Sequence, residues 1–343
     1  MKTYNLCLLG FGNVGRALLR LLQEKTVELR ERYAIEWRLT GVATRQLGWL
    51  ADPAGLDVAA LLDGGVEQIA AYQDVRGWLA AARADVLFEL TSLDVATGQP
   101  AIEHIRAALE HGAHAITANK GTVVHGYQEL SELARKQQRR FLFEATVIGG
   151  APIFSLFDTT LPAANLLRFR GLLNATSNVI IEEMERGKNF ADAVRTAQEL
   201  GIAETDPAAD VDGWDAAVKI CAISTVLMRK PITLEQIELE GIRNLSVDQV
   251  QAARAAGTPY KLVAQVERLE QGVKAFVRPE PIAADDPLAG VTGGSLLAHF
   301  ELDVLPGLTV KLDVPDKGPA GPLGPAVTAY DVLADFIRAV QQS

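Results

Sequence analysis

The feature that most constrains the fold is a glycine-rich turn close to the N-terminus. The apolar run Tyr4 to Leu9 leads into this turn, and a helical pattern of apolar residues follows it directly. Glycines at its first two positions allow a tight turn and a close approach to a pyrophosphate, while the third lets the helix pack on the strand. A purely structural turn is the alternative interpretation. We predict a dinucleotide site that includes Gly10, Phe11, Gly12, Asn13, Val14 and Gly15.

The second predicted strand, from Glu36 to Ala43, bears on which dinucleotide is bound. Sites that prefer NAD usually place an acidic residue after this strand, about 20 residues beyond the glycines, where it binds the ribose hydroxyls. This chain has Thr44 and Arg45 at that place instead. Because an arginine can pair with a 2′-phosphate, we expect NADP, with NAD as the other candidate. The alternative is that Arg45 is only an exposed residue that opens a loop.

Two further apolar strands, expected at 85–90 and 113–117, end in polar residues. Ligands of open parallel sheets bind beyond the carboxyl ends of the strands. This rule places Thr91 and Ser92 after the first strand, and Lys120 after the second, at the edge that meets the cofactor or the substrate.

The domain organisation follows from a change in pattern along the chain. Residues 1–145 are typical of a Rossmann-type domain with a doubly wound parallel sheet. Later, the alternating segments 260–269 and 273–277 flank a short polar turn and indicate a hairpin. We therefore predict a second α+β domain with a mixed sheet at 146–318, which binds substrate and forms a dimer. The last segment, 319–343, contains an amphipathic helix that we expect to complete the first domain.

The other expected elements are local predictions from apolar periodicity and turn residues. They comprise strands at 139–145, 166–172, 296–304 and 308–314, and helices at 100–111, 127–138, 153–158, 179–185, 191–200 and 327–340.

The segment 201–219 gathers five carboxylates and one lysine beside an apolar helix. Asp210 or Asp212 is expected to cap this helix, which would place Asp212, Asp215 and Lys219 on one face. A surface ion pair is the alternative interpretation. The apolar residues around Lys219 predict a buried helix instead, and a buried lysine needs partners or a task. Burial and neighbouring carboxylates act in opposite directions on its protonation, which suits a residue that transfers protons.

Composition limits the partners and the compartment of the chain. Its 33 basic and 43 acidic residues give a net charge of −10, which argues against nucleic acid and anionic membranes as partners. No apolar run reaches the roughly 20 residues that cross a bilayer, and no signal peptide is visible. Cys7 and Cys221 lie in apolar segments far apart in the chain, so a disulfide framework is not expected. We expect a cytoplasmic protein that acts on a small molecule.

Several motifs give the chain a resemblance to the homoserine dehydrogenases. The motifs are GFGNVG at 10–15, TANK at 117–120, EATVIGGAP at 144–152, LLNATSN at 172–178 and AETDPAADVDGWDAAVK at 203–219. The resemblance implies NAD(P)-dependent interconversion of L-homoserine and L-aspartate 4-semialdehyde, on the route to threonine, methionine and isoleucine. It also implies a homodimer formed through the second sheet, with which exposed apolar strands such as 296–302 would be consistent. The chain is similar to short members that carry no C-terminal regulatory domain.

The resemblance also implies roles for individual residues. Lys219 falls on the proposed proton donor, Lys120 on a lysine at the reacting centre, and Asp215 on the aspartate that holds the donor. Substrate binding is implied for Glu204, Asp210, Thr176 and Asn174. A monovalent cation such as sodium is implied at Glu144, Val147, Gly149 and Ala151, and Gly318 matches a glycine that approaches the cofactor.

Departures from the family pattern and other functions stay open at this point. Ala175 stands where the family commonly has glycine, and Ile202 where it has an aromatic residue, so the substrate pocket could differ. An acylating aldehyde dehydrogenase would need a nucleophilic cysteine, which neither apolar cysteine suits. A non-catalytic, regulatory NADPH-binding protein of the same fold is the second alternative. The histidines at 104, 111 and 114 are interpreted as solvated surface, and His125 receives no role.

Overall fold

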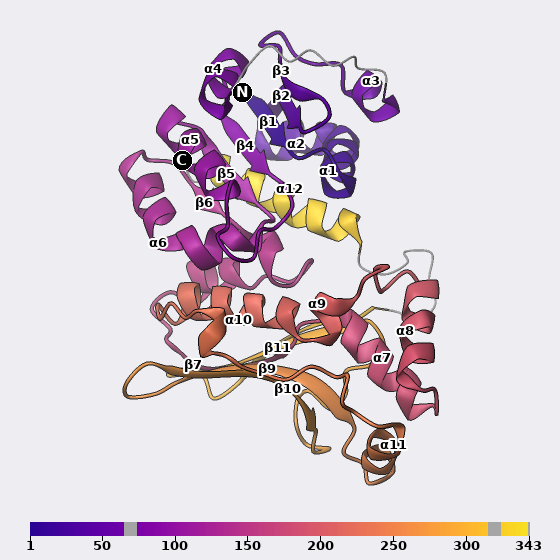
Figure 1. Ribbon diagram of the computed structural model, residues 1–343. Helices are drawn as coiled ribbons and strands as arrows, with labels where there is room; N and C mark the ends of the chain where they lie inside the picture. Colours follow the sequence, from indigo (N-terminus) through magenta and orange to yellow (C-terminus); the bar gives the residue numbers. More distant parts are fainter. Residues whose placement is uncertain (65–73, 315–323, 342–343) are drawn as a thin grey trace. The chain divides into compact units, whose positions relative to one another are not determined.

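The computed structural model describes residues 1–64, 74–314 and 324–341 (Figure 1). It divides into two compact units, the first made of 1–150 with 325–343 and the second of 151–324. Gly318, expected near the cofactor, lies outside the described residues. Within the described ranges, no helix combines the length and the apolar character needed to cross a membrane.

The sheet of the first unit has the strand order β3-β2-β1-β4-β5-β6. Its strands β1, β2, β4, β5 and β6 pair in parallel, as predicted. One edge strand was not foreseen, because β3 turns back from β2 and pairs with it in antiparallel fashion. The strands are β1 (Lys2–Leu9), β2 (Ile35–Thr44), β3 (Gly48–Ala51), β4 (Val86–Glu89), β5 (His114–Thr117) and β6 (Phe141–Leu142).

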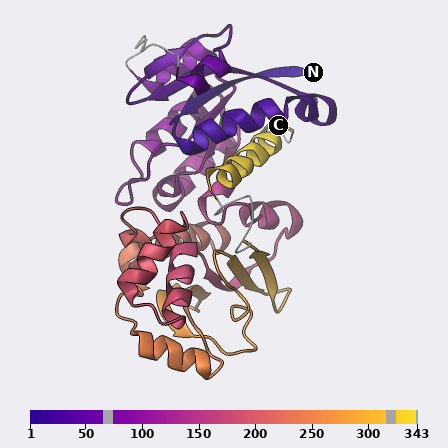
Figure 2. The same ribbon diagram turned by 90° about the vertical axis from the view of Figure 1, so that its right-hand side faces the viewer.

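Helices cover both faces of this sheet. Helix α1 (Asn13–Glu24) and the terminal helix α12 (Pro325–Gln341) lie side by side in Figure 2 and share one apolar core with β1 and β4. On the other face, Trp78 and Cys7 both lie against Gly41. That face carries α4 (Val75–Ala82), α5 (Ala101–His111) and α6 (Lys120–Lys136), while α2 (Thr26–Tyr33) and α3 (Val58–Asp63) lie in the connections that flank β2 and β3.

The second unit contains a mixed sheet with the order β12-β11-β7-β9-β10-β8. Its neighbours pair in antiparallel fashion except β8 and β10, which are parallel. The hairpin predicted around residue 271 is the β9–β10 pair. The strands are β7 (Leu166–Leu172), β8 (Glu238–Leu239), β9 (Tyr260–Arg268), β10 (Val273–Pro281), β11 (Leu296–Leu302) and β12 (Leu308–Leu312).

Helices α7 (Ala175–Glu185) and α10 (Trp214–Leu227) pack against β9 (Figure 1). The other helices of this unit are α8 (Phe190–Glu199) and α11 (Val247–Ala255), which contact α7, and the short α9 (Ala208–Val211). Strand β11 lies inside the sheet, with Leu297 and Phe300 buried within this chain. The exposed apolar strand expected there is therefore not found.

Several predicted elements differ from the structure in their bounds or type. Helix α6 begins at Lys120 rather than near 127, because the Asn119 side chain accepts a hydrogen bond from Gly121 N and caps it. The strand expected at 139–145 shortens to β6, because a 3₁₀ turn begins at Glu144. The helix expected at 153–158 is a single π turn, Leu156–Thr160.

Candidate functional site

The glycine turn in the first unit has the shape that a dinucleotide needs. Gly10 has a φ of +95°, and a Cβ there would lie 2.5 Å from the Leu90 carbonyl oxygen. A Cβ on Gly15 would lie 2.7 Å from the Gly10 carbonyl oxygen. Side chains are therefore excluded at both positions.

Within this turn, Gly12 is the N-cap of α1. No side chain caps the helix there, and a Cβ on Gly12 would lie within 4 Å of no described atom outside its neighbours in the chain. The first N–H groups of α1, from Asn13 onward, can bind an anion such as a pyrophosphate. Phe11, by contrast, is buried under the Arg16 guanidinium, 4.5 Å from its ring centroid. The residues present thus fit a dinucleotide.

Arg45 lies in the turn between β2 and β3 and is exposed. The Thr44 side chain orders this turn, because its hydroxyl oxygen accepts hydrogen bonds from Gln46 N at 3.2 Å and Leu47 N at 2.9 Å. Arg45 is therefore held at the carboxyl end of β2, with a side chain accessible to a ligand. Its role in cofactor choice stays a prediction.

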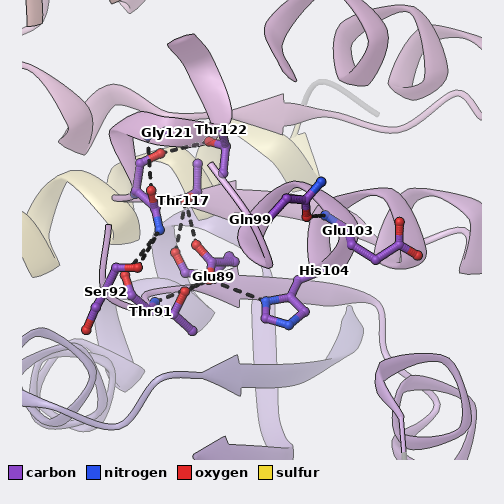
Figure 3. A network of polar contacts seen from close by, with 10 residues as sticks. Glu89, Thr91, Ser92, Gln99, Glu103, His104, Thr117, Gly121 and Thr122 are labelled. Carbon is purple, nitrogen blue, oxygen red and sulfur yellow. Dashed lines mark hydrogen bonds and ion pairs between the residues drawn. The ribbon is translucent and has the colours of Figure 1, made fainter. Parts of the chain in front are cut away.

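The ends of β4 and β5 come together through Asn119. Its side-chain amide donates to the Thr91 carbonyl at 3.3 Å and to the Ser92 carbonyl at 3.2 Å. Lys120 follows directly as the first, half-buried residue of α6. Figure 3 shows this edge of the sheet, where Thr91 and Ser92 lie close to the start of α6. The structure thus joins the two strand ends that the sequence placed at one edge.

Side chains of the terminal helix α12 contact the turn that is expected to hold a cation. The Asp335 carboxylate accepts a hydrogen bond from Glu144 N at 2.8 Å, and the Asp331 carboxylate accepts one from Gly150 N at 2.9 Å. Arg338 lies 3.3 Å from the Glu144 carboxylate. Burial raises the pKa of Asp331 to about 7 and that of Asp335 to about 7.

The predicted cation ligands are distributed over both units. Glu144, Val147 and Gly149 belong to the first unit, and Ala151 begins the second. Glu144 and Val147 are buried. Among the residues described, no group of three or more His, Cys, Asp and Glu side chains could hold a metal. The sequence reasoning missed Asp331 and Asp335, although two acids one turn apart on an apolar helix face were a usable signal.

In the second unit, Lys219 lies inside a compact polar cluster. Its ammonium nitrogen is 2.7 Å from an Asp215 carboxylate oxygen and 2.6 Å from the Leu173 carbonyl oxygen, and its side chain is only 11% exposed. Asn174 completes the cluster, because its amide donates to Asp210 at 2.6 Å and to Asp215 at 3.1 Å. The side-chain oxygen of Asn174 accepts from Ser177 N at 2.9 Å and so caps α7.

Other members of the predicted site lie at the margin of this cluster or outside it. The Thr176 hydroxyl donates to the Ile202 carbonyl at 3.2 Å, and Glu204 is exposed. Asp212 is not on the face of Lys219, which corrects the prediction. Gly213, with a φ of +85°, forms the N-cap of α10 and turns the chain, so Asp212 precedes the helix and pairs with Arg243.

The backbone accounts for the alanine at position 175. Ala175 begins α7 directly after the Asn174 cap and does not adopt a positive φ. A glycine is therefore not required there by the backbone.

The two cysteines cannot supply a ready nucleophile. Both thiols are buried and free. Burial raises the pKa of Cys7 and of Cys221 to about 12 in each case. Since the thiolate is the reactive form, neither cysteine suits the nucleophile that an acylating aldehyde dehydrogenase needs.

Three polar residues in the first unit were missed or misinterpreted. Glu89 ends β4 and is fully buried, and His104 Nδ1 lies 3.6 Å from its carboxylate. His114 is buried as well, so the interpretation of these histidines as solvated surface was wrong for 104 and 114. A carboxylate that closes a wholly apolar strand, as in Val86–Glu89, was the signal available for Glu89.

Comparisons with known proteins agree along the whole chain. The model of the family "Homoserine dehydrogenase" matches residues 152–337, and that of "Homoserine dehydrogenase, NAD binding domain" matches 10–144. The chain is 33% identical to an NAD(+)-dependent homoserine dehydrogenase of Pseudomonas canavaninivorans, covering 100% of this chain and 98% of that protein. It is 32% identical to the homoserine dehydrogenase of Methanocaldococcus jannaschii, over 97% of this chain and 98% of that protein.

Solved structures give the same result. A putative homoserine dehydrogenase of Archaeoglobus fulgidus superposes with a TM-score of 0.83 at 28% identity, covering 98% of this chain and 99% of that one. The homoserine dehydrogenase of Thermoplasma acidophilum superposes with a TM-score of 0.80 at 26% identity, covering 99% and 100%.

Proposed function

Because the chain belongs to the homoserine dehydrogenase family and is an NAD(P)-dependent oxidoreductase that interconverts L-homoserine and L-aspartate 4-semialdehyde, we propose that Lys219 is its proton-transfer residue. The observation that carries this proposal is the cluster of Lys219, Asp215 and Asn174, in which a nearly buried ammonium group is held between a carboxylate and a carbonyl.

The chemistry of the reaction explains why such an ammonium group is useful. A bound nicotinamide supplies or accepts the hydride, and the substrate oxygen gains or loses a proton in the same conversion. Asp215 and the Leu173 carbonyl orient two of the three N–H donors of Lys219. The remaining N–H can point at the substrate oxygen. Asp215 pairs with the ammonium group of the lysine and fixes its position.

The acidic neighbours suit the amino end of the substrate. Asp210 lies in the cluster through its hydrogen bond from Asn174, and we assign it with the exposed Glu204 to the substrate ammonium group. Asn174 and Thr176, at the start of α7, are the proposed uncharged substrate contacts. Lys120, at the start of α6, is the second lysine proposed for the reaction, on the strength of the family resemblance.

A direct assay tests this function. Purified protein with NADP or NAD should show an increase in the absorbance of reduced nicotinamide when L-homoserine is added, and none with L-serine. Lys219→Ala is the matched inactive control. A protein that binds the cofactor but reduces neither NADP nor NAD with homoserine would favour the non-catalytic, NADPH-binding alternative.

For the cofactor, we propose a preference for NADP that depends on Arg45. The exposed position of Arg45 at the end of β2 supports this choice. The NAD(+)-dependent relative keeps NAD as the competing candidate. Titration of wild type and Arg45→Ala with both cofactors decides, with Arg32→Ala as a control for loss of an exposed arginine. A preference for NAD in wild type, or a ratio unchanged by Arg45→Ala, would refute the proposal.

We also propose that the turn from Glu144 to Ala151 binds a monovalent cation such as sodium. Main-chain oxygens of Val147, Gly149 and Ala151 and the carboxylate of Glu144 are ligands of the kind that hard cations take. The measurement is thermal stability and turnover in sodium against tetramethylammonium chloride at equal ionic strength. Equal values in both salts would contradict a cation site.

The remaining proposals concern organisation. We propose that residues 1–145 with 319–343 form the cofactor domain and that 146–318 form the substrate and dimerisation domain. A cytoplasmic homodimer with small-molecule substrates and no nucleic-acid partner fits this organisation and the net charge of −10. Sedimentation equilibrium tests the dimer, and a monomer at working concentration would refute it.

A further inference from the structure

Glu89 is a fully buried carboxylate at the carboxyl end of β4, at 0% exposure. The three residues before it in the strand are apolar and pack into the sheet. Burying a carboxylate costs free energy unless hydrogen bonds satisfy it. Its partners therefore show what the residue does.

Those partners come from three separate stretches of the first unit, as Figure 3 shows. One carboxylate oxygen accepts hydrogen bonds from the Thr91 hydroxyl and from Thr91 N, the latter at 3.3 Å. The other oxygen accepts from the Thr117 hydroxyl at 3.1 Å. His104 Nδ1 lies 3.6 Å from the first oxygen and has no hydrogen-bond partner among the described residues.

These contacts belong to a closed ring of hydrogen bonds. Thr117 Oγ1 accepts a hydrogen bond from Asn119 N at 2.9 Å. The Asn119 amide donates to the carbonyls of Thr91 and Ser92, which returns the path to Glu89 through Thr91. The ring thus ties the exit of β4 to the exit of β5, directly before Lys120.

We propose that Glu89 is a positioning residue for the bound nicotinamide cofactor. Through Thr91 it sets the backbone of the β4 exit, and through Thr117 and Asn119 it sets the start of α6, which carries Lys120. The inference rests on the proposed cofactor role of Thr91, Ser92 and Lys120. A displacement of about 1 Å at a reacting site can lower a rate by about a hundredfold. The hydrogen bonds of the buried Glu89 can therefore affect the reaction by holding the residues of this site in place.

The geometry predicts which substitutions the ring tolerates. A glutamine at position 89 keeps an oxygen for Thr91 and turns its amide toward Thr117. The Thr117 hydroxyl can then donate to the main-chain carbonyl of residue 89, which is already 3.0 Å away. A methionine fills a similar volume but removes both links. Thr117→Val is nearly isosteric and removes the hydroxyl that links Glu89 to Asn119, with its hydrogen bond to the Glu89 carbonyl.

The test compares Glu89→Gln, Glu89→Met and Thr117→Val in the full chain. Thr40→Val is the matched control, because Thr40 is equally buried in β2 of the same sheet and its hydroxyl contacts only Leu6 and Cys7 among the described residues. We measure kcat, KM for NADP and homoserine, NADPH affinity by fluorescence, and Tm, with kinetics well below the lowest Tm.

For a positioning role, Glu89→Met and Thr117→Val should weaken NADPH binding by about tenfold and lower kcat/KM for homoserine by about ten- to a hundredfold. Glu89→Gln should recover to within about threefold of wild type, and Thr40→Val should lower Tm without changing kinetics. If Glu89→Met fails to fold, Thr117→Val carries the test.

Two outcomes would overturn the proposal. One is Thr117→Val with wild-type kinetics and NADPH affinity and only a lower Tm, which is a structural role alone. The other is Glu89→Gln as impaired as Glu89→Met, since hydrogen-bond geometry would then not be the cause. NADPH affinity is measured without turnover. A wild type that binds NADPH but oxidises no homoserine would therefore refute the proposed reaction and leave the test of Glu89 intact.

Discussion

Two lysine–carboxylate pairs in the described part of the second unit have a lysine side chain that is largely buried, and helix α7 reaches both. At its N-cap, Asn174 contacts Asp215, whose carboxylate is 2.7 Å from Lys219. Two turns later, Glu182 of the same helix lies 3.4 Å from Lys261 of β9. The groups are chemically alike, but the side chain of Lys261 is 2% exposed and that of Lys219 is 11% exposed.

The two pairs differ in the other partners of their carboxylates, Glu182 and Asp215. Glu182 also accepts a hydrogen bond from Gly293 N at 2.9 Å, so the Lys261 pair connects a helix, a strand and a loop. Asp215 lies on the same helix as Lys219, one turn earlier, and connects the lysine to the side chain of Asn174. A buried pair that joins distant elements is suited to fixing the fold, whereas one within a helix beside further acids can hold a proton donor toward a substrate.

The largest effect, a fall in turnover with little change in stability, is expected from Lys219→Ala. Loss of a general acid lowers turnover by about two to four orders of magnitude. Cofactor affinity and Tm should change little, because Lys219 and the glycine turn belong to different units and the lost ion pair is within one helix. The measurements are kcat, NADPH affinity and Tm. Turnover near that of wild type would remove Lys219 from the proposed role.

The reverse pattern is expected from Lys261→Met. Removing Lys261 leaves the buried Glu182 carboxylate with only the exposed Arg186, 3.9 Å away, as a cationic partner among the described residues, which costs about 3 kcal/mol in the free energy of unfolding. The double variant Lys261→Met with Glu182→Gln should recover part of that loss. Denaturant unfolding measures both. If Lys261→Met instead lowered kcat strongly with little loss in the free energy of unfolding, Lys261 would belong to the reaction. The contrast between the two lysines would then fail.

Arg195→Ala provides the baseline for this experiment. Arg195 pairs with Asp192 on the surface of α8, and its side chain is 65% exposed. Exposed pairs contribute about 1 kcal/mol or less. A loss in Arg195→Ala as large as that in Lys261→Met would show that burial does not distinguish these pairs.

A smaller effect is expected from Asp215→Asn. The amide oxygen can still accept a hydrogen bond from Lys219, but the ion pair is lost. We expect kcat to fall by about tenfold with a smaller change in KM, as a loss specific to the transition state requires. Ser224→Ala on the same helix is the control, because its hydroxyl binds only the Lys230 carbonyl among the described residues. An equal fall in both variants would point to a general disturbance of α10.

The same two lysines show how far the sequence can be interpreted. The burial of Lys219 was predictable because its helix is otherwise apolar and acids precede it, so local periodicity sufficed. Lys261 was missed because a single lysine near the start of a strand resembles an edge residue, and only the packing of α7 and the 293 loop on β9 buries it. The parallel sheet and the mixed sheet were predictable for the same reason as Lys219, because strand patterns are local.

Features that depend on one backbone angle or on contacts between distant segments were not predictable. Asp212 was assigned to the face of Lys219, but the left-handed conformation of Gly213 separates it from α10. Glu89 gave only a weak signal, because its role follows from Thr91, Thr117 and Asn119 coming together at the sheet edge. Secondary structure and single helices thus follow from local sequence, whereas shared polar networks require the tertiary fold.

The smallest effect is expected where α7 begins. Ala175 separates the Asn174 cap from the rest of the helix and needs no positive φ, so Ala175→Gly should cost about 1 kcal/mol or less through backbone entropy alone. Ala191→Gly, an exposed alanine in the first turn of α8, is the matched control.

Because the Asn174 side chain is held by Asp210, Asp215 and Ser177 N, its position should survive added freedom at the next residue, and KM for homoserine should stay within about twofold. A several-fold change in KM in Ala175→Gly but not in Ala191→Gly would show that the methyl group of Ala175 shapes the substrate end of α7. The functional end of this helix would then depend on packing as closely as the Lys261 end does.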